Sequence, residues 1–304
     1  LRTGQLTREA QRLSVACQTQ QDCFIALGTT KLWHWDGTSF TNHGDSRVVH
    51  AVLRLADGRV IALRDGHSEG KNVTFALFSE DKWVDQPAVK VEVPGRHAQL
   101  GAVRLAPDGL VWLSLSYQDK QGSRVPYGIA AVDLELGTVF YHRASFDKEA
   151  TKQGILPVPV DISGIAFLDD TLWLSSSQGA TRVIGEEVKT FIEADGLRSE
   201  LLRAVVCSSG GMVYTASSRG VGTWDGERWT YPDELRTSIN DLAMGKNRHL
   251  WLATDRGLGV YDGANTKRLD TSRGLLENRV LDLESDSFGR IWLRSEQGLV
   301  VVSP

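Results

Sequence analysis

Apolar and polar residues alternate in short runs of four to seven residues along the whole chain, and Gly, Asp, Asn and Ser separate these runs. The 3.6-residue period of a long amphipathic helix is almost absent. Short alternating runs between turn-forming residues are typical of β-strands. The pattern therefore predicts an all-β protein.

One phrase recurs along the chain: polar turn residues followed by an apolar strand that carries a large side chain. It is clearest at residues 108–113, 247–252 and 288–293. Looser copies complete a series of seven repeats, whose marker residues are Ile25, Ile61, Trp112, Trp173, Tyr214, Trp251 and Trp292. The markers lie 36 to 61 residues apart, with a mean of 44.5, and this mean is the length of a propeller blade.

A glycine also recurs at a fixed distance after the marker. In four repeats a Gly follows the marker by six residues, at Gly179, Gly220, Gly257 and Gly298. Ser/Thr-x-x-Gly followed by an apolar residue is typical of a tight hairpin turn. The repeat therefore contains four strands, and residues 1–304 are predicted to form a single domain, a seven-bladed β-propeller of four-stranded antiparallel blades.

The last repeats carry a more specific phrase. Residues 274–299 contain Gly274-Leu275, then Asp286 and Gly289 before Trp292, and finally Gly298-Leu299. This phrase resembles the two-component-regulator propeller repeat, and the resemblance is secure over roughly the C-terminal half of the chain. It implies extracytoplasmic sensing in bacterial signalling proteins, and hence a periplasmic or extracellular location. The chain contains no kinase, which suggests an excised domain or a stand-alone adaptor.

The seventh repeat ends after three predicted strands. Because an open blade edge invites aggregation, we expect a strand from residues 2–7 to close the last blade. The alternative is an N-terminal tail beside a three-stranded blade.

Three insertions make the middle repeats uneven. They lie at residues 64–73, 117–127 and 142–159, and strand alternation predicts that all three emerge on one face of blades 2–4. Long loops on a rigid scaffold often bind partners; the alternative is tolerated variation of surface loops. The residues expected to contact a partner here are Arg64, His67, Tyr117, Arg124, Tyr127 and Phe146.

Polar residues recur near the start of each predicted inner strand, about eleven positions before the marker. On the same face, these positions are predicted to surround the mouth of a central channel. Such a set could bind a small polar ligand or an anion; the alternative is a water-filled channel whose polar groups are satisfied. The candidates are His50, Asp161, Arg203, Asn240, Asp241, Arg279 and Asp282.

Other conspicuous residues are expected to be structural. The tryptophan markers recur at one strand position, which favours packing between blades over carbohydrate stacking. Asp36-Gly37, Asp225-Gly226 and Asp262-Gly263 are turn phrases, so their carboxylates are not catalytic candidates.

Composition excludes several classes of function. The chain carries 34 Lys and Arg residues against 38 Asp and Glu residues, a net charge of −4, which argues against nucleic-acid binding through phosphate contacts. No apolar run reaches the roughly 18 residues of a membrane-spanning helix. The motifs of nucleophile elbows, phosphate loops and zinc or calcium sites are missing from the sequence, so no catalytic residue, metal or cofactor is predicted.

The three cysteines do not decide between an oxidising and a reducing compartment. Cys17 and Cys23 flank a polar stretch whose length suits a disulfide-closed hairpin in an oxidising compartment, and two half-buried thiols are the alternative. Cys207 lies in an apolar run, where a free cysteine usually acts as a small buried hydrophobic residue.

Three functions fit the sequence. The favoured one is a non-enzymatic sensor or interaction module that binds a ligand or protein partner on the loop-rich face and the channel mouth. The second is an enzyme resembling streptogramin lyase, for which His50 with Asp161 or Asp282 is the set to test. The third is a structural subunit of an envelope or surface complex, with an apolar patch that includes Phe146, Ile155 and Leu156.

Overall fold

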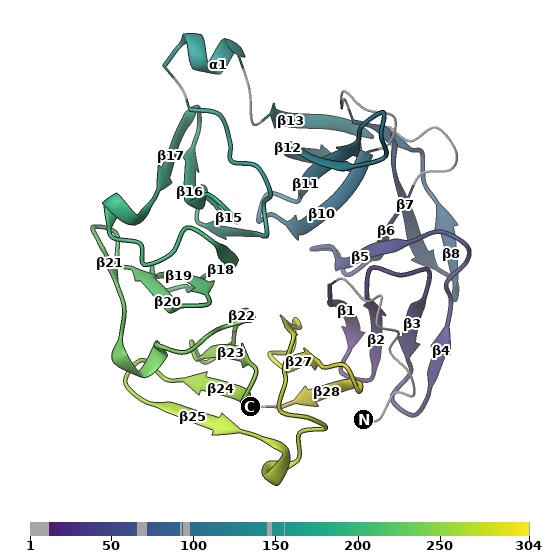
Figure 1. Ribbon diagram of the computed structural model, residues 1–304. Coiled ribbons are helices and arrows are strands. Elements are labelled where there is room, and N and C mark those ends of the chain that lie inside the picture. Colours follow the sequence, from purple (N-terminus) through teal and green to yellow (C-terminus); the bar gives the residue numbers. More distant parts are fainter. Residues whose placement is uncertain are drawn as a thin grey trace. The chain divides into compact units, whose positions relative to one another are not determined.

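The computed structural model describes residues 12–65, 72–91, 93, 98–144, 148–154 and 156–303 (Figure 1). The chain divides into two compact units. The N-terminal unit comprises Thr7–Ala144 and the short segment Asp286–Phe288, and the C-terminal unit comprises Ser145–Ser285 and Gly289–Pro304.

The N-terminal unit contains three antiparallel sheets, blades 1 to 3, in which consecutive strands pair, apart from the short last strand of blade 2 (Figure 1). Blade 1 is formed by β1 (Ser14–Thr19), β2 (Asp22–Ala26), β3 (Leu32–Trp35) and β4 (Phe40–Asn42). Blade 2 is formed by β5 (Val49–Arg54), β6 (Val60–Asp65), β7 (Asn72–Ser79), β8 (Lys82–Asp85) and β9 (Val89–Lys90). Blade 3 is formed by β10 (Ala98–Leu105), β11 (Val111–Gln118), β12 (Arg124–Asp133) and β13 (Thr138–Ala144).

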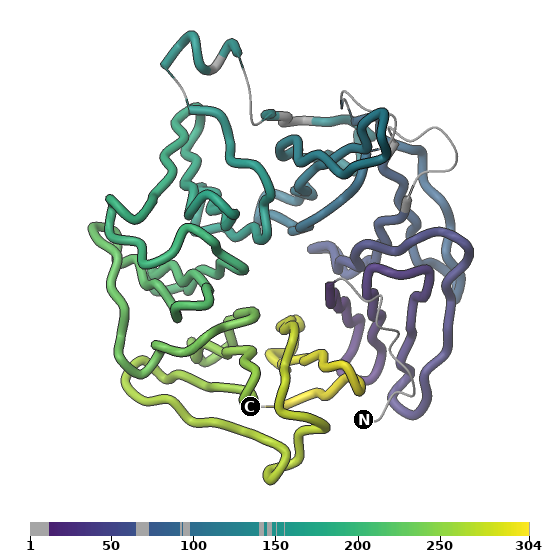
Figure 2. The backbone as a smooth tube through the Cα atoms, in the orientation of Figure 1, coloured from purple at the N-terminus to yellow at the C-terminus, as the bar shows by residue number. Residues whose placement is uncertain are grey.

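The C-terminal unit contains blades 4 to 7, and its backbone runs from teal to yellow in Figure 2. Blade 4 is formed by β14 (Gly164–Leu168), β15 (Thr171–Ser176), β16 (Gly179–Ile184) and β17 (Glu187–Phe191). Blade 5 is formed by β18 (Leu202–Cys207), β19 (Val213–Ser217), β20 (Gly220–Trp224) and β21 (Trp229–Thr230). Blade 6 is formed by β22 (Asp241–Met244), β23 (Leu250–Thr254), β24 (Gly257–Tyr261) and β25 (Thr266–Leu269), and blade 7 by β26 (Asp282–Ser285), β27 (Ile291–Arg294) and β28 (Leu299–Val302).

The prediction of an all-β, seven-bladed propeller fold is confirmed. All seven marker residues lie on the second strand of a blade, from Ile25 on β2 to Trp292 on β27. Blade 7 has three strands among the described residues. The strand expected to close it, at residues 2–7, lies outside the described residues, and the single domain over residues 1–304 stays a prediction.

The irregular middle of the chain departs from the expected loops. The insertion at residues 117–127 is mostly strand, because β11 and β12 pair as far as Gln118 and Arg124. In blade 2, β9 adds a fifth strand by pairing with β7. The insertion at residues 142–159 contains the helix α1 (Lys148–Lys152).

The Ser/Thr-x-x-Gly phrase forms the turn between the second and third strands. In each copy the hydroxyl donates to the Gly carbonyl, as in Thr254 Oγ1 to Gly257 O at 2.7 Å, and the same bond occurs at Ser176, Ser217 and Ser295. Gly257 has a φ of 128°, a region that residues with a side chain rarely adopt. The phrase therefore specifies both the turn and its hydrogen bond.

Short 3₁₀ helices link successive blades of the C-terminal unit: η1 (Glu193–Asp195), η2 (Asp233–Leu235) and η3 (Thr271–Arg273). After η1 and η3 the Gly-Leu phrase puts Gly in the left-handed region. The Leu that follows is buried, as Leu197 and Leu275 show with exposed fractions of 3% and 7%. The repeated Gly-Leu phrase thus turns the chain and anchors it in the core.

The core consists of apolar clusters between neighbouring blades of each unit. Trp173, at 1% exposed, packs against Phe191 and Trp229 at ring-centroid distances of 5.6 and 6.1 Å. Trp251 and Trp292 are also buried. Packing between blades is thus confirmed for Trp173, which lies in the cluster of blades 4 and 5, and for Trp251, which lies in the cluster of blades 6 and 7, whereas Trp112 is half-buried.

The segment Asp286–Phe288 belongs to a different unit from the residues that flank it in the sequence. It is the turn between β26 and β27 of blade 7, yet it clusters with the residues of the N-terminal unit. Asp286 is buried there, and its Oδ2 lies 3.7 Å from Cys17 Sγ. The N-terminal unit is therefore completed by residues from near the end of the chain.

Candidate functional site

The seven residues predicted at the channel mouth are divided between the two units. His50 is half-buried on β5 of the N-terminal unit, and the other six belong to the C-terminal unit. The histidine and the carboxylates proposed for an enzyme therefore come from different units.

In the C-terminal unit, Arg203 and Asn240 lie in one polar network. Arg203 Nη1 donates to Ile239 O at 3.0 Å and to Asn240 Oδ1 at 3.1 Å. Asn240 Nδ2 in turn donates to Val280 O and to Asp255 Oδ1, each at 2.9 Å. The bonds from Arg203 and the bond to Val280 run from one blade to the start of the next, whereas the bond to Asp255 lies within blade 6, so these side chains tie blades 5, 6 and 7 together.

Arg279 extends the same network. Its Nε lies 3.5 Å from Asp255 Oδ1, and its Nη1 donates to Glu296 Oε1 at 2.9 Å. The two guanidinium groups of Arg203 and Arg279 are thus matched by two carboxylates. The network is exposed and electrically balanced, which favours the structural alternative for this set.

The three aspartates of the predicted set differ in environment. Asp241 Oδ2 accepts a hydrogen bond from the backbone of Leu283 at 2.9 Å, which joins blades 6 and 7. Asp282 is buried beside Arg294, with 3.6 Å between Oδ2 and Nε. Asp161 is exposed and has a φ of 58°. The binding of a small polar ligand by this set stays a prediction.

Sequence reasoning missed Asp255 and Glu296, the acceptors of this network. Both occupy the position after the hydroxyl residue of a Ser/Thr-x-x-Gly turn. Their contacts with Asn240 and Arg279 confirm that this turn and the start of the inner strand share one end of the blade. The signal in the sequence was an acidic residue at the same point of two turns.

Three of the predicted partner-contacting residues gather on blade 3. Tyr117 and Tyr127 are half-buried, with ring centroids 6.1 Å apart and an interplanar angle of 78°. Arg124 is exposed, and its Nε donates to Ser116 Oγ at 2.9 Å. We call the end of this hairpin, with Tyr117 and Tyr127 on one face and Gln118 and Arg124 on the other, the blade-3 ledge.

The ledge stands on long, fixed strands. Strands β11 and β12 have 8 and 10 residues, whereas the second and third strands of blades 4 to 7 have 4 to 6. Asp119 Oδ1 accepts hydrogen bonds from the backbone of Gln121 and Ser123 and fixes the connecting turn. The side chains of the ledge are therefore held in place without a partner.

Arg64, another residue expected to contact a partner, is buried in blade 2. His67 and Phe146 lie outside the described residues. Arg64 is 4% exposed, and its Nη1 lies 3.3 Å from Asp45 Oδ2 and 3.7 Å from Asp85 Oδ1. Its guanidinium also lies over the ring of Trp83. Burial lowers the pKa of Arg64, and these contacts fix the link between blades 1 and 2.

Arg47 completes the charge cluster around Arg64. Its Nη2 lies 2.6 Å from Asp45 Oδ2 and its Nη1 lies 3.0 Å from Asp85 Oδ2. The hydrogen bond from Arg47 lowers the pKa of Asp45 and raises that of Arg47. Two carboxylates and two guanidinium groups thus balance one another at this site.

Cys17 and Cys23 form a disulfide. They are directly opposite each other in the β1–β2 hairpin, where cross-strand side chains are close. Cys207 is a free, half-buried cysteine on β18. The disulfide alternative of the sequence analysis is therefore the one that the structure adopts.

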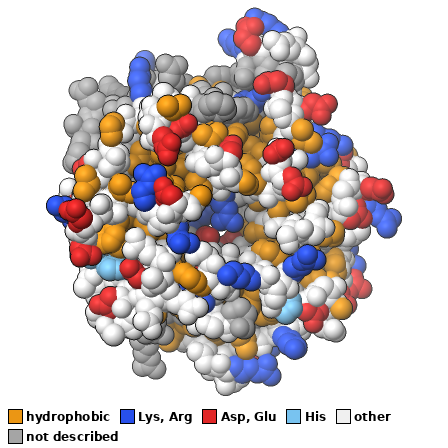
Figure 3. All heavy atoms as spheres, turned by 180° about the vertical axis from the view of Figure 1, so that it is seen from behind, with side chains coloured by type: hydrophobic (Ala, Val, Ile, Leu, Met, Phe, Trp, Pro, Cys, Tyr) orange, Lys and Arg blue, Asp and Glu red, His pale blue; other side chains and the backbone are white. Residues whose placement is uncertain are grey.

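Within the described ranges, no group of three or more His, Cys, Asp or Glu side chains is arranged to hold a metal ion. No helix in the described part of the chain is long and apolar enough to cross a membrane. On the face shown in Figure 3, basic and acidic side chains are interspersed.

Comparisons with known proteins show the fold. No family model matches the chain, and no curated protein matches it. The chain is similar to the extracellular domain of the putative hybrid two-component system BT3049 from B. thetaiotaomicron, with a TM-score of 0.71 and 16% identity. That likeness covers 98% of this chain and 39% of the BT3049 chain, so this chain spans well under half of that protein.

Two further solved structures are similar over 99% of this chain. A catalytically inactive virginiamycin B lyase from Staphylococcus aureus, solved with quinupristin, has a TM-score of 0.64 and 10% identity, and 97% of it is covered. YCF48 bound to D1 peptide has a TM-score of 0.65 and 12% identity, and 95% of it is covered. The chain thus shares its propeller fold with an extracellular domain, an enzyme and a peptide-bound protein.

Proposed function

We propose that the chain is a non-enzymatic interaction module that binds a protein partner through the blade-3 ledge. The observation that carries this proposal is the extension of β11 and β12, which brings Tyr117 and Tyr127 edge to face at the margin of the core cluster between blades 2 and 3, with the exposed Arg124 on the opposite face of the hairpin. Tyr and Arg dominate the binding energy of protein interfaces. A rigid hairpin also loses little conformational entropy when it binds.

The solved structures support a binding role for this fold. YCF48 is a propeller of similar fold that was solved bound to a peptide, and the BT3049 domain is an extracellular part of a putative two-component system. By comparison, the polar network of Arg203, Asn240 and Arg279 offers a ligand fewer open donors, because its members bind one another.

We also infer that the module works in the periplasm or outside the cell. The Cys17–Cys23 disulfide supports this location, since disulfides persist in oxidising compartments and are rare in the cytosol. The extracellular setting of the BT3049 domain points the same way.

Photo-crosslinking from the ledge tests the proposal. A benzoylphenylalanine at Gln118 is expected to capture one partner from a cell-envelope extract, whereas the same group at Glu227, in an exposed turn of blade 5, captures none. Adding Tyr117→Ala and Tyr127→Ala should reduce the crosslink about tenfold or more, because two aromatic anchors are lost. Circular dichroism shows whether the double variant still folds.

A second variant separates binding from stability. Arg124→Glu reverses one exposed charge and leaves the aromatic pair in place, so it should weaken the crosslink, while the loss of the hydrogen bond to Ser116 should lower the melting temperature by only about 2–4 °C. Equal capture from Gln118 and Glu227, or capture that survives both variants, would refute the ledge as the binding surface.

A further inference from the structure

We propose that a cavity between blades 2 and 3 of the N-terminal unit binds a small organic cation with an apolar body, such as an aralkyl amine. The cavity lies at the opposite end of blade 3 from the ledge, because it is bounded by the turn after Leu105 whereas the ledge is paired with Ala98. The site and its ligand are therefore independent of the partner surface proposed above.

The cavity has the size and walls of a small-molecule site. Its volume is about 630 Å³, within the range of pockets that hold drug-sized ligands. Its walls come from four places in the fold: the β5–β6 turn, the β10–β11 turn, the end of β12, and the bend after β8. The apolar lining includes Leu55, Ile61, Phe75, Pro87, Leu105 and Leu134.

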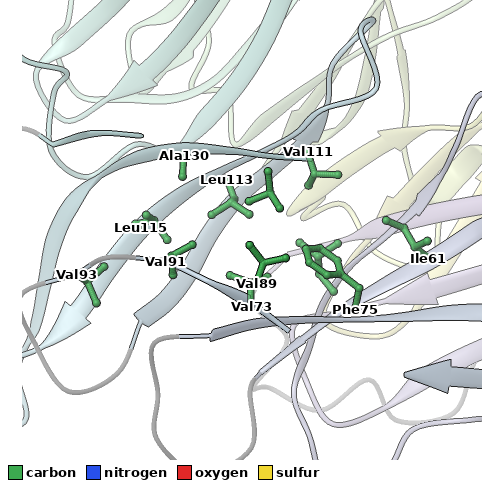
Figure 4. Close-up of a cluster of buried hydrophobic side chains, with 12 residues drawn as sticks. Ile61, Val73, Phe75, Val89, Val91, Val93, Val111, Leu113, Leu115 and Ala130 are labelled. Carbon is green, nitrogen blue, oxygen red and sulfur yellow. The ribbon is translucent and has the colours of Figure 1, made fainter. Parts of the chain in front are cut away.

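The floor of the cavity belongs to the packed core. Ile61 and Phe75 are 4% and 3% exposed and lie next to each other at one end of the buried cluster between blades 2 and 3 (Figure 4). The cluster continues through Val89 and Leu113 (Figure 4). Because these side chains are fixed by close packing, the shape of the floor does not depend on a ligand.

The lining carries an excess of negative charge. Four carboxylates, those of Asp57, Asp108, Asp133 and Glu135, line the cavity together with one guanidinium, that of Arg59. Arg59 Nε lies 2.6 Å from Asp57 Oδ2, and its Nη2 lies 3.6 Å from Glu135 Oε1. The single cation is thus shared by two carboxylates, one from each blade.

The aspartates are held by their own turns. Asp108 Oδ1 accepts from the backbone of Leu110 at 3.0 Å, and Asp133 Oδ1 accepts from Glu135 and Leu136, each at 2.9 Å. In both residues these turn hydrogen bonds use Oδ1, so Oδ2 can accept from another donor. Asp57 is fixed in the same way, and its hydrogen bonds with Arg59 lower its pKa.

These features select the class of ligand. An apolar floor of this size favours a hydrocarbon or aromatic body. The carboxylates attract an ammonium group, and a charge-assisted hydrogen bond to a carboxylate is stronger than a neutral one. An anion of the same shape would be repelled by the net negative charge of the lining, so the sign of the ligand's charge decides its affinity.

Three probes of equal length test the charge preference. Calorimetric titration of the whole chain with 4-phenylbutylamine, 4-phenylbutanol and 4-phenylbutanoate is expected to rank the amine first and the carboxylate last. The alcohol should bind about tenfold more weakly than the amine, because it lacks the charge-assisted hydrogen bond. Equal binding of the amine and the carboxylate, or no binding of the amine, would overturn the proposal.

Matched variants then locate the site. Asp108→Asn with Asp133→Asn keeps the turn-forming Oδ1 and removes two charges, so it should weaken the amine about tenfold and leave the alcohol unchanged. Asp225→Asn is the control, since Asp225 caps the same kind of turn in blade 5. Leu134→Trp, which fills the cavity from its edge, should abolish binding of both probes. If the amine binds every variant as tightly as the parent, the site lies elsewhere and the proposal fails.

Discussion

At the residue scale, His43 is the side chain whose protonation the fold opposes most clearly. Its ring lies 5.3 Å from that of His34 and is bordered by Phe24 and Phe78. Burial is the main cause that lowers the pKa of His43, and the charge of His34 adds to it, while Asp81 acts in the opposite direction. The neutral imidazole is therefore the form that suits the packed position between blades 1 and 2.

Stability should consequently fall on acidification. Unfolded His43 takes up a proton near its ordinary pKa of about 6.5, whereas the folded chain takes it up only at lower pH. The contribution is thus fully present above about pH 6.5 and is lost as the pH falls towards the lowered value. In thermal melts from about pH 8 to pH 5, His43→Gln should lose less of its melting temperature than the parent. A parallel pH dependence of the two proteins would contradict this assignment.

Some residue roles were readable from the sequence because they are local. Asp36 was predicted to be a turn residue, and its Oδ1 accepts from the backbone of Thr38 and Ser39. These hydrogen bonds hold the pKa of Asp36 well below its usual range. The partners of Arg203 and Arg279 were not readable, because they depend on how one blade stacks on the next.

At the element scale, the Ser/Thr-x-x-Gly turn is the most repeated device in the chain. It closes the hairpin between the second and third strands of blades 4 to 7. In blades 4 to 6 its Gly lies close to the backbone at the end of the outer strand or in the link that follows. A Cβ at Gly257 would stand 2.2 Å from Leu269 O, and a Cβ at Gly179 would stand 2.1 Å from Phe191 O. The Gly is required both for its positive φ and for space.

Gly257→Ala should therefore destabilise the protein by about 2 kcal/mol or more, since it adds a backbone clash to the cost of a strained φ. Urea denaturation measures the change. Gly263→Ala is the matched control, because Gly263 has a φ of 102° and a Cβ added there would meet nothing within 4 Å. That control should cost only about 1 kcal/mol. Equal losses at the two glycines would mean that the contact with Leu269 contributes nothing.

Element prediction succeeded where the repeat is regular and failed where it is not. The markers and Gly turns located the second strand of every blade because the same residues recur at the same spacing. Residues 117–127 were predicted as an insertion that lengthens the central hairpin of blade 3, and β11 and β12 do continue their pairing there. Among the described residues, the short strand β9 and the helix α1 have no counterpart in the other repeats. The repeat pattern therefore could not predict them.

At the scale of the whole molecule, positive and negative charges nearly balance. The formal net charge is −4, and basic and acidic side chains are interspersed on the face shown in Figure 3. The two charge clusters described above each balance guanidinium groups with carboxylates. Long-range attraction to a polyanion is therefore weak.

The chain should accordingly pass through a DNA or heparin column at about 0.1 M salt. A basic protein of similar size, applied to the same column, provides the positive control. Retention that requires more than about 0.3 M salt for elution would reveal a basic surface and contradict the charge distribution inferred from the sequence.

The segment Asp286–Phe288 has a consequence for the order of folding during synthesis. Domains generally fold as units, N-terminal first, as they leave the ribosome. Here the unit built from Thr7–Ala144 includes residues 286–288, and its buried Asp286 is synthesised only after the whole of blades 4 to 6. The N-terminal unit, whose first residues are synthesised earliest, is therefore complete only after residues 286–288 have been synthesised.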